Sequence, residues 1–492
     1  MSCYLGIDLG TSEVKVLLLD DQHQRLATAA HPLGLSRPAP LWAEQNPADW
    51  WQACCAALDE LAASYPQFMA RVRGIGLSGQ MHGAVLLGEG DAVLRPAILW
   101  NDGRSQAECQ EMMDECPALA QIAGNLAMPG FTAPKLRWLA KHEPAVFAAI
   151  HSVLLPKDWL RLKLSGEKVS EMSDAAGTLW LDVAQRDWSD ELLALCGLTR
   201  AQIPRLVEGS EVSARLLPAL AARWGLPADV LIAGGGGDNA ASAVGIGAVQ
   251  PGAGFLSLGT SGVLFVVNEA FRPNPQSAVH AFCHALPGRW HQMSVMLSAA
   301  SCLKWVTQLT GRVDEAALLA EVAQLDVAAR EAAPIFLPYL SGERTPHNDP
   351  HAQGVFFGLG FTHAGADLGW SVLEGVAFAF RDGLAALQSA GTRVAQLSLV
   401  GGGARSALWA QLLADVLQTE IVTHAGGEAG GALGAARLAW LSDGGEETRV
   451  CVAPPVAERF IPAPPNASLE SRYQRFRALY AALKAEFPRE QS

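Results

Sequence analysis

The sequence predicts an α/β fold built from two similar halves, and three features of the chain lead to this prediction. Apolar segments rich in β-branched residues alternate with segments of helical periodicity. The run Leu9-Gly10-Thr11-Ser12 recurs 249 positions later as Leu258-Gly259-Thr260-Ser261, in a chain of 492 residues. Glycine-rich turns follow several predicted strands, at the strand ends where α/β folds bind their ligands.

The first copy of the repeat lies in a predicted β-hairpin. Residues 4–8 and 14–20 have the composition of strands, and the glycine-containing turn joins them. The turn offers backbone N–H groups and hydroxyls that can cradle a phosphate, and the carboxylate of Asp8 can hold Mg²⁺. Considered alone, the segment fits an ordinary hairpin with small turn residues better than a ligand site.

The second copy has similar flanking strands but lacks the carboxylate. Residues 255–257 precede it, residues 263–267 follow it, and Ser257 takes the position of Asp8. Repetition at half the chain length indicates two similar folding units, each with its own turn. We expect the two turns to have different tasks, because only the first carries an acid.

The composition is that of a globular protein with large apolar cores. Half of the residues are hydrophobic and 17% are charged, and the length predicts two to four domains. The net charge is −13 and no run of lysines or arginines occurs, which argues against nucleic acid as a partner. The nine cysteines form no C-x-x-C pair, which indicates free thiols in a reducing compartment.

Neither a signal peptide nor a membrane span is expected. The N-terminus enters a strand directly, without a charged region and a cleavage site, so we expect a cytoplasmic protein. Residues 239–267 carry no charge, but several glycines and Pro251 interrupt them. We therefore expect this stretch to be buried α/β chain.

Strands and helices alternate through the first half. A helix starts at Pro47, after the cap residue Asn46, and runs to about residue 63. Further strands are predicted at 72–77, 85–87, 96–100 and 230–233, and further helices at 105–113, 134–141, 144–150 and 240–247. Gln250-Pro251-Gly252 then interrupts the pattern, so we place a domain boundary near residue 247, between domains 1–247 and 248–492.

The second half continues the pattern and ends in a helix. Helices are predicted at 297–309, 367–388 and 406–417, and a strand at 397–400. Residues 453–465 are rich in proline and are expected to be extended. Apolar residues then recur with helical spacing from Leu469 to Phe487. Such a stripe usually docks a helix on its own domain, and a partner interface is the less favoured alternative.

Asp238 is the candidate catalytic base. A predicted strand ends in four glycines at positions 234–237, and Asp238 follows at the start of a helix. An aspartate in this place can be a mere helix cap, which is equally favoured when the residue is considered alone. The glycine run favours catalysis, because a cap does not need such a close approach of the backbone to a ligand. Phosphoryl transfer needs a base for the attacking hydroxyl, and Asp238 suits that task.

A further glycine run, Gly401-Gly402-Gly403, lies between a predicted strand and a predicted helix. Its glycines permit close approach of a nucleotide, and a helix N-terminus is electropositive. The run does not fit G-x-G-x-x-G, and no G-x-x-x-x-G-K-[ST] loop occurs in the chain. Dinucleotide binding and a Walker loop are therefore poorly supported.

The ordered motifs between about residues 4 and 440 resemble the FGGY-type carbohydrate kinases. These motifs are Gly6-Ile7-Asp8-Leu9-Gly10-Thr11-Ser12, Thr132-Ala133-Pro134-Lys135-Leu136-Arg137-Trp138, Gly237-Asp238-Asn239, the second Leu-Gly-Thr-Ser run, Gly354-Val355-Phe356-Phe357-Gly358-Leu359, Leu373-Glu374-Gly375 and Gly401-Gly402-Gly403-Ala404. The resemblance implies the fold shared with hexokinase, actin and the heat-shock ATPases. In that fold two similar ribonuclease-H-like domains flank a central cleft.

The resemblance also implies ATP and Mg²⁺ as cofactors and assigns a role to each site residue. Asp238 would take the proton of a sugar hydroxyl, and Asp8 would help to hold Mg-ATP. The implied sugar contacts are Met81, His82 and Asn239. The implied nucleotide contacts are Thr11, Gly259 and Thr260 at the phosphates and Gly401, Gly402 and Gly403 at the adenosine. For His82, a satisfied structural histidine is the alternative.

Within this family the chain is most similar to the branch that acts on D-xylulose. The similarity rests on Gly79-Gln80-Met81-His82-Gly83, Trp100-Asn101-Asp102-Gly103-Arg104 and Ser341-Gly342-Glu343-Arg344-Thr345-Pro346-His347. It implies phosphorylation of D-xylulose to D-xylulose 5-phosphate, and the alternative is another ketose or polyol, such as ribulose or glycerol. The expected partners are the sugar and ATP, and a homodimer is left open. A nucleotide-driven chaperone or a silent sugar sensor of the same superfamily has less support.

Several other residues remain open from the sequence. His280, His284 and His291 are close in the chain, but a structural or pocket-lining role is favoured over zinc binding. Arg344 could meet a phosphate or the surroundings of Glu343. Any of Trp42, Trp100 and Trp305 could stack on a sugar or adenine, although most tryptophans must be core.

Overall fold

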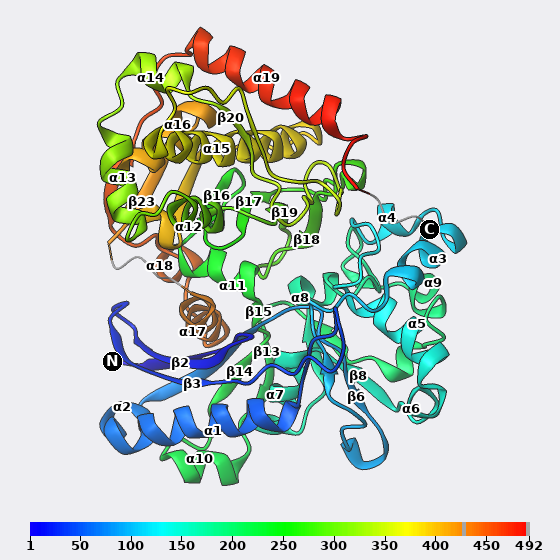
Figure 1. Ribbon diagram of the computed structural model, residues 1–492. Helices are drawn as coiled ribbons and strands as arrows, with labels where there is room; N and C mark the ends of the chain where they lie inside the picture. The colour runs from blue at the N-terminus through cyan, green and yellow to red at the C-terminus, as the bar shows by residue number, and fades with distance from the viewer. Residues whose placement is uncertain (426–429, 489–492) are drawn as a thin grey trace.

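The computed structural model describes residues 1–425 and 430–488, and its centre consists of two seven-stranded sheets (Figure 1). The strands of the first sheet are β1 Cys3–Leu9, β2 Glu13–Asp20, β3 Arg25–Pro32, β5 Val72–Gly79, β13 Val212–Arg215, β14 Leu231–Ala233 and β15 Gly236–Gly237. Their order is β13-β14-β5-β1-β2-β3, and β15 pairs with β5. Strand β2 pairs antiparallel with both β1 and β3, whereas β5 runs parallel to β1 and to β14.

The second sheet repeats this arrangement. Its strands are β16 Ala253–Leu258, β17 Gly262–Asn268, β18 His280–Cys283, β19 Trp290–Met296, β22 Gln396–Val400, β23 Ile421–His424 and β24 Val456–Phe460. Strands β16, β17 and β19 are antiparallel, and β22 runs parallel to β16 and to β23. An antiparallel strand closes the same edge in both sheets, β13 in the first and β24 in the second. The predicted fold of two similar α/β units is therefore confirmed.

The two Leu-Gly-Thr-Ser runs occupy equivalent turns. The first joins β1 to β2 and the second joins β16 to β17. Asp8 pairs with Ser78 of the parallel strand β5, and Ser257 pairs with Val400 of the parallel strand β22. The position that holds an acid in the first half thus holds a hydroxyl in the second.

The predicted helices are present, with shifts of a few residues at their ends. The helices before residue 250 are α1 Pro47–Ser64, α2 Pro66–Met69, α3 Gln106–Glu115, α4 Leu119–Ile122, α5 Thr132–His142, α6 Pro144–Ala148, α7 Pro156–Ser165, α8 Met172–Ala176, α9 Asp190–Ala194, α10 Pro218–Trp224 and α11 Asp238–Gly245. The later helices are α12 Ala300–Leu309, α13 Glu315–Ala323, α14 Val327–Ala332, α15 Gly365–Ser389, α16 Ala407–Leu417, α17 Gly431–Ser442, α18 Glu447–Val450 and α19 Ala467–Leu483. Asn46 caps α1 as predicted, since its side chain accepts the N–H of Ala48.

The minor strands form small pairs outside the two sheets. They are β4 Glu44–Gln45, β6 Val85–Leu87, β7 Ala97–Ile98, β8 Ser152–Leu154, β9 Val169–Glu171, β10 Leu181–Asp182, β11 Asp187–Trp188, β12 Arg205–Val207, β20 Ile335–Leu337 and β21 Val355–Phe357. Strand β6 has the predicted bounds. The strand predicted at 96–100 is shorter, because the chain already turns at Trp100, where Leu99 accepts the backbone N–H of Asp102.

Helix α17 comes from the second half of the chain but packs on the first sheet, against β1 and β5. Figure 1 shows α17 and α1 on opposite sides of this sheet. Two strand glycines permit the contact. A Cβ atom on Gly6 would lie 1.8 Å from the carbonyl oxygen of Ala432, and one on Gly76 would lie 1.8 Å from that of Ala435. The domain boundary near residue 247 stays a prediction, and α17 connects the two sides of it.

The C-terminal helix α19 docks on its own half, as predicted. Tyr473 donates a hydrogen bond to Asp382 of α15, and Tyr480 donates one to Asp349. The Pro-rich segment before it is extended in part and supplies β24. In the described part of the chain, no helix has the length and apolar character needed to cross a bilayer. All nine cysteines are free and buried.

Candidate active site

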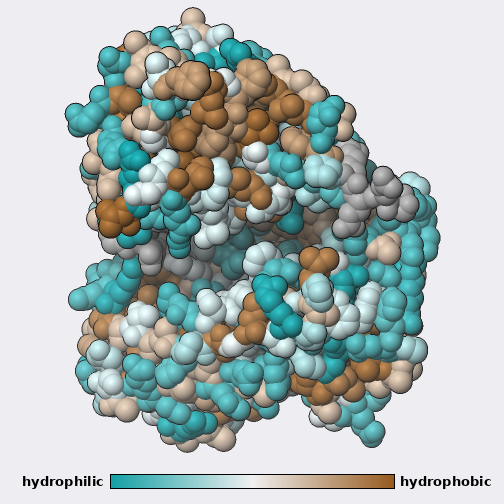
Figure 2. Space-filling model, viewed as in Figure 1, coloured by the Kyte–Doolittle hydropathy of each residue, from teal (hydrophilic) through white to brown (hydrophobic). Residues whose placement is uncertain are grey.

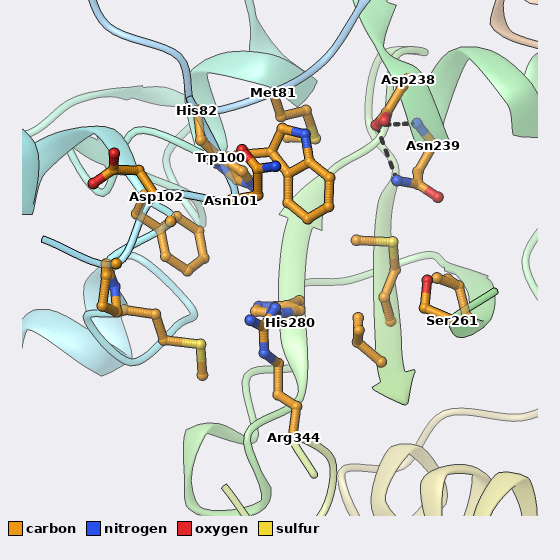
Figure 3. Close-up of a pocket in the computed structure, with 18 of the residues that line it drawn as sticks. Met81, His82, Trp100, Asn101, Asp102, Asp238, Asn239, Ser261, His280 and Arg344 are labelled. Atoms are coloured by element: carbon orange, nitrogen blue, oxygen red, sulfur yellow. Dashed lines mark hydrogen bonds between the residues drawn. The ribbon is translucent and has the colours of Figure 1, made fainter. Parts of the chain in front are cut away.

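A pocket of about 580 Å³ lies between the two halves of the molecule. Figure 2 shows the surface hollowed between the part that contains the first sheet and the part that contains the second. Residues from both halves line the pocket, and Figure 3 shows the central ones. The lining includes Met81, His82, Trp100, Asn101, Asp102, Phe131, Asp238, Asn239, Ser261, His280, Phe282 and Arg344.

Asp238 is the first residue of α11 and does not cap it. The cap position belongs to Gly237, and the carboxylate instead accepts two hydrogen bonds from Asn239, from the backbone N at 2.7 Å and from Nδ2 at 2.9 Å. Burial raises the pKa of Asp238 to about 6, and the negative charge of Asp8 also raises it. A carboxylate that holds a proton this close to neutral pH is suited to general base catalysis.

The glycines before Asp238 are required by protein packing. Gly235 has a φ of 83°, and a Cβ atom on it would lie 2.2 Å from the carbonyl oxygen of Leu77. A Cβ atom on Gly234 would lie 2.2 Å from the carbonyl oxygen of Glu208. The glycine run predicts close approach of a ligand, but at these two positions the close neighbours are protein backbone.

A buried group of charged residues supports this glycine run, and the sequence did not reveal it. Lys157 Nζ lies 2.7 Å from Asp158 Oδ1, 3.0 Å from Asp174 Oδ2 and 3.4 Å from Glu171 Oε1. Burial raises the pKa of Asp174 to about 8. The cations Lys157 and Arg161 thus face three carboxyl groups, and burial favours the protonated form of one of them, Asp174. Mutual pairing of this kind is needed to keep charges buried.

Ser173 connects this buried group to the residue before Asp238. Its hydroxyl donates to Glu171 Oε2 at 2.8 Å and accepts the backbone N–H of Gly237 at 3.0 Å. Arg161 donates to the carbonyl oxygens of Ala233 and Gly234. The backbone that carries Asp238 is thus fixed from the side away from the pocket.

The predicted sugar contacts Met81 and His82 line the same pocket as Asp238 and Asn239 (Figure 3). His82 Nδ1 lies 2.6 Å from the carbonyl oxygen of Gly177, so this nitrogen donates its proton. Burial lowers the pKa of His82 to about 3, which keeps the ring neutral. Its Nε2 atom is therefore an acceptor for a sugar hydroxyl.

Thr11 lies beside the pocket, and Trp100 connects it to the lining. The indole Nε1 of Trp100 donates to Thr11 Oγ1 at 3.0 Å, and Thr11 Oγ1 donates to Gln80 Oε1 at 3.3 Å. Of the three tryptophans considered from the sequence, only Trp100 belongs to the pocket lining. Trp42 stacks under Arg104, and Trp305 stacks on Phe336 and Phe356.

Asp8 lies where helix α17 begins. A Cβ atom on Gly431, the first residue of α17, would lie 2.7 Å from Asp8 Oδ1 and 2.4 Å from Ser78 Oγ. Burial raises the pKa of Asp8. The carboxylate thus lies near the Ser78 hydroxyl and a helix N-terminus, whose partial positive charge favours an anion.

The other predicted nucleotide contacts form a second cluster, outside the pocket lining. The carbonyl oxygens of Gly259 and Thr260 accept the backbone N–H groups of Ala300 and Ala299, at the start of α12. Gly401 has a φ of 90°, and a Cβ atom on it would lie 2.9 Å from the carbonyl oxygen of Leu258. The turn 258–261 therefore lies against Gly401, while Gly402 and Gly403 open the 3₁₀ turn η4 Gly402–Arg405.

The pocket contains residues that received no role from the sequence. Phe131, Phe282 and Asn101 line it, and the motif residue Asp102 orders the adjacent loop by accepting the backbone N–H of Ala43 at 2.6 Å. Of the three histidines considered for zinc, His280, His284 and His291, the first lines the pocket. This agrees with the structural or pocket-lining role that the sequence favoured over zinc binding. In residues 1–425 and 430–488, no group of three or more His, Cys, Asp or Glu side chains could hold a metal.

Two family models match the chain in order. The N-terminal domain model of the FGGY family of carbohydrate kinases matches residues 3–245, and the C-terminal domain model matches residues 254–442.

Curated relatives and solved structures agree with this match over nearly the whole chain. A xylulose kinase of Escherichia coli is 52% identical over 483 residues, which cover 98% of this chain and 99% of the relative. One from Klebsiella pneumoniae is 54% identical over 437 residues, 89% of each chain. A solved "xyloylose kinase" from Brucella ovis is 51% identical with a TM-score of 0.95, covering 98% of this chain and all of its own.

These matches span both sheets and the pocket between them. The chain belongs to the FGGY family of carbohydrate kinases, which are phosphotransferases.

Proposed function

We propose that this kinase transfers the γ-phosphoryl group of ATP to the terminal hydroxyl of D-xylulose and forms D-xylulose 5-phosphate. The observation that carries the proposal is the position of Asp238. Its carboxylate, with a pKa near 6, lines a pocket of sugar size together with Met81, His82 and Asn239. The similarity to xylulose kinases above 50% identity supports D-xylulose as the sugar.

In the proposed reaction Asp238 takes the proton of the C5 hydroxyl. The C5 oxygen then forms a bond to the γ-phosphorus, the bond from that phosphorus to the bridging oxygen breaks, and ADP leaves. Neutral His82 accepts a hydrogen bond from the sugar, and Asn239 orients the Asp238 carboxylate through two hydrogen bonds. Thr11, Gly259 and Thr260 are proposed to contact the phosphates, and Gly401, Gly402 and Gly403 the adenosine.

The residues around Asp8 fit a magnesium ion that is shared with ATP. Mg²⁺ prefers oxygen ligands and is commonly held by one or two carboxylates plus substrate phosphates. Asp8 supplies one carboxylate, and no closed metal cage of His, Cys, Asp and Glu exists among the described residues. When bound, the ion would neutralise charge on the transferred phosphoryl group.

The role of Asp8 can be tested through the metal requirement. We expect Asp8→Asn to raise the Mg²⁺ concentration needed for half-maximal turnover by about tenfold or more. The reason is that a neutral amide replaces the charged carboxylate that would bind the ion. A Mg²⁺ titration at saturating sugar and ATP measures this. Glu13→Gln, at the start of the next strand β2, is the control. An unchanged requirement in the Asp8 variant would remove Asp8 from the site.

A panel of acceptors tests the function itself. In a coupled assay of ADP release, D-xylulose should give a higher kcat/KM than ribulose, glycerol or xylitol. A higher kcat/KM for one of the other acceptors would make that compound the substrate in place of D-xylulose. The assignment of the chain as a kinase would not change. Cytoplasmic location and a homodimer remain predictions, which fractionation of the source cells and sedimentation would check.

A further inference from the structure

Arg344 lies in the pocket, and neither the proposed chemistry nor the predicted sugar contacts use it. It belongs to the loop between β20 and β21. In Figure 3 its side chain reaches toward His280, on the opposite side of the pocket from Asp238. The two residues therefore can contact opposite ends of one small molecule.

The guanidinium of Arg344 makes no direct ion pair with a described residue, and the nearest acid in its surroundings is Glu343. In the described chain, no carboxylate lies within 4.0 Å of its guanidinium. The adjacent Glu343 is occupied, since its Oε1 atom accepts the backbone N–H groups of Leu297 at 3.0 Å and of Arg344 at 2.8 Å. Burial raises the pKa of Glu343 to about 8, so at neutral pH this carboxyl is largely protonated. A guanidinium left without an anion in a pocket is available to a ligand.

Two neighbours fix the direction of the guanidinium. Arg344 Nη1 lies 3.4 Å from His280 Nε2, and His280 Nδ1 lies 2.8 Å from Asn125 Oδ1. Arginine only donates, so Nε2 of His280 accepts and Nδ1 carries the proton. The Asn125 amide is fixed in turn, because its Nδ2 donates to the carbonyl oxygens of Ala123 and Ala281. This chain of contacts holds Arg344 in one orientation.

The remaining side-chain donors of Arg344 are free. Among the described residues, Nε and Nη2 have no hydrogen-bond partner. They are donors only, and a planar guanidinium presents them in a fixed fork. A group of this kind is best matched by an oxygen that accepts and does not donate, such as a carbonyl oxygen.

The chemistry of the proposed reaction places such an oxygen on the substrate. A 2-ketopentose can close to a furanose only through its C5 oxygen, and that oxygen must be free to attack the phosphorus. The reacting sugar is therefore the open chain, with a free carbonyl at C2. Resting on the proposed function, we infer that Arg344 binds the C2 carbonyl oxygen and sets the preference for a ketose over the corresponding polyol.

The preference follows from the lack of acceptors around Arg344. In a polyol, C2 carries a hydroxyl whose own proton needs a partner. His280 Nε2 already accepts from Arg344, and Glu343 Oε1 already accepts two N–H groups. The other oxygen, Glu343 Oε2, has no hydrogen-bond partner, but it is buried and Glu343 is not part of the pocket lining. The hydroxyl proton would lose its water partners without gaining a new one, which disfavours the polyol.

The test compares D-xylulose with xylitol and D-arabinitol, the two products of its reduction at C2. Arg344→Met keeps an unbranched side chain as far as the position of Nε and removes the donors. We expect kcat/KM for D-xylulose to fall about 10–100-fold, chiefly through KM, because a hydrogen bond to a charged group is lost. For the polyols it should change less than about threefold, so the ratio of ketose to polyol falls. Arg344→Lys should recover part of the ratio.

Arg37→Gln is the matched control. Arg37 also lines the pocket, but it is exposed at the rim, so its loss should leave the ketose-to-polyol ratio near that of the wild type. If Arg344→Met is poorly folded, the same ratio is measured for Arg344→Lys and for Asn125→Ala. A ratio within twofold of wild type in folded Arg344 variants would overturn the inference.

The acceptor panel with the wild-type enzyme decides separately which sugar is the substrate. If it prefers ribulose, the same comparison is made with ribulose and its polyols, so that the role of Arg344 is still decided. If it prefers a polyol to every ketose, both the proposed function and this inference are wrong.

Discussion

The proton affinity of the Asp238 carboxylate is set by its burial and by two neighbours, Asp8 and Asn239. The carboxylate is buried beside a second acid, Asp8, and both effects raise its pKa. The two hydrogen bonds from Asn239 lower the pKa of Asp238, because they stabilise the charged carboxylate. A base is active when deprotonated, so activity should be present above about pH 6 and lost as the pH falls through this value.

This balance gives a prediction on pH dependence. The acid limb of kcat/KM against pH should have an apparent pKa near 6. Asn239→Ala removes the Nδ2 donor and should move the limb to higher pH, whatever its effect on the absolute rate. Asp238→Asn should lower turnover by about 10²–10⁴-fold above about pH 6, where the wild-type base is deprotonated, as expected for loss of a general base. A limb unmoved in Asn239→Ala would show that another group controls it.

Ser173 is predicted to position Asp238 without touching the sugar. Ser173→Ala leaves the N–H of Gly237 without its acceptor, and we expect kcat to fall about tenfold, in line with an unsatisfied buried donor. The control is Ser170→Ala, because Ser170 donates to Asp158 in the same buried group but does not reach Gly237. Both variants should lose similar thermal stability, and only Ser173→Ala should lose kcat. Equal rates in the two would assign Ser173 a purely structural role.

At the scale of residues, the candidate base and sugar contacts could be predicted from the sequence. The buried residues that hold the backbone next to the candidate base could not. Asp238, Met81 and His82 stand next to recognisable turns. The contact from Ser173 to Gly237 joins residues that are 64 positions apart, and no local pattern indicates it. Arg344 was visible as part of a motif, yet its unpaired charge depends on the burial of Glu343 and on His280, which only the folded chain brings together.

Helix α17 packs closely on strands β1 and β5, backbone against backbone. Gly76→Ala would place a Cβ atom 1.8 Å from the carbonyl oxygen of Ala435, so the helix must move. We expect a loss of about 3 kcal/mol or more in unfolding free energy, at the upper end for overpacked sites. Thermal and urea unfolding measure this change.

Two further glycines make that prediction specific. Gly74→Ala meets Ala439 only at 3.2 Å and should cost less, and Gly34→Ala meets nothing within 4 Å and should be nearly neutral. The expected order of stability is Gly34→Ala, then Gly74→Ala, then Gly76→Ala. A Gly76 variant as stable as the Gly34 variant would contradict the packing described here.

Most elements could be predicted from local sequence, whereas their partners could not. Helix α1 begins at its predicted cap and β6 has its predicted bounds, because capping and alternation are local signals. The glycines in β1 and β5 gave no sign of a helix packed on them, since α17 lies in the other half of the sequence. The strand predicted at 96–100 was too long because the turn at Trp100 depends on Asp102 and its distant partner Ala43.

For the whole molecule, the repeat of four residues correctly indicated two related sheets. We predict that they close on each other when sugar and nucleotide bind, since the pocket draws residues from both halves and excluded water favours phosphoryl transfer. Small-angle scattering should show a smaller radius of gyration with D-xylulose plus a non-hydrolysable ATP analogue than without them. An unchanged radius would mean that the pocket is already in its working form.

The path of α17 also affects how the chain is made. The ribosome completes the strands of the first sheet at Gly237, but the helix that covers one of its faces begins only at Gly431. At 5–20 residues per second, this interval lasts roughly 10–40 s. During that time the apolar face around Gly6 and Gly76 has no native cover. The nascent chain must therefore be shielded, by chaperones or by its own transient contacts, until nearly the whole protein has been translated.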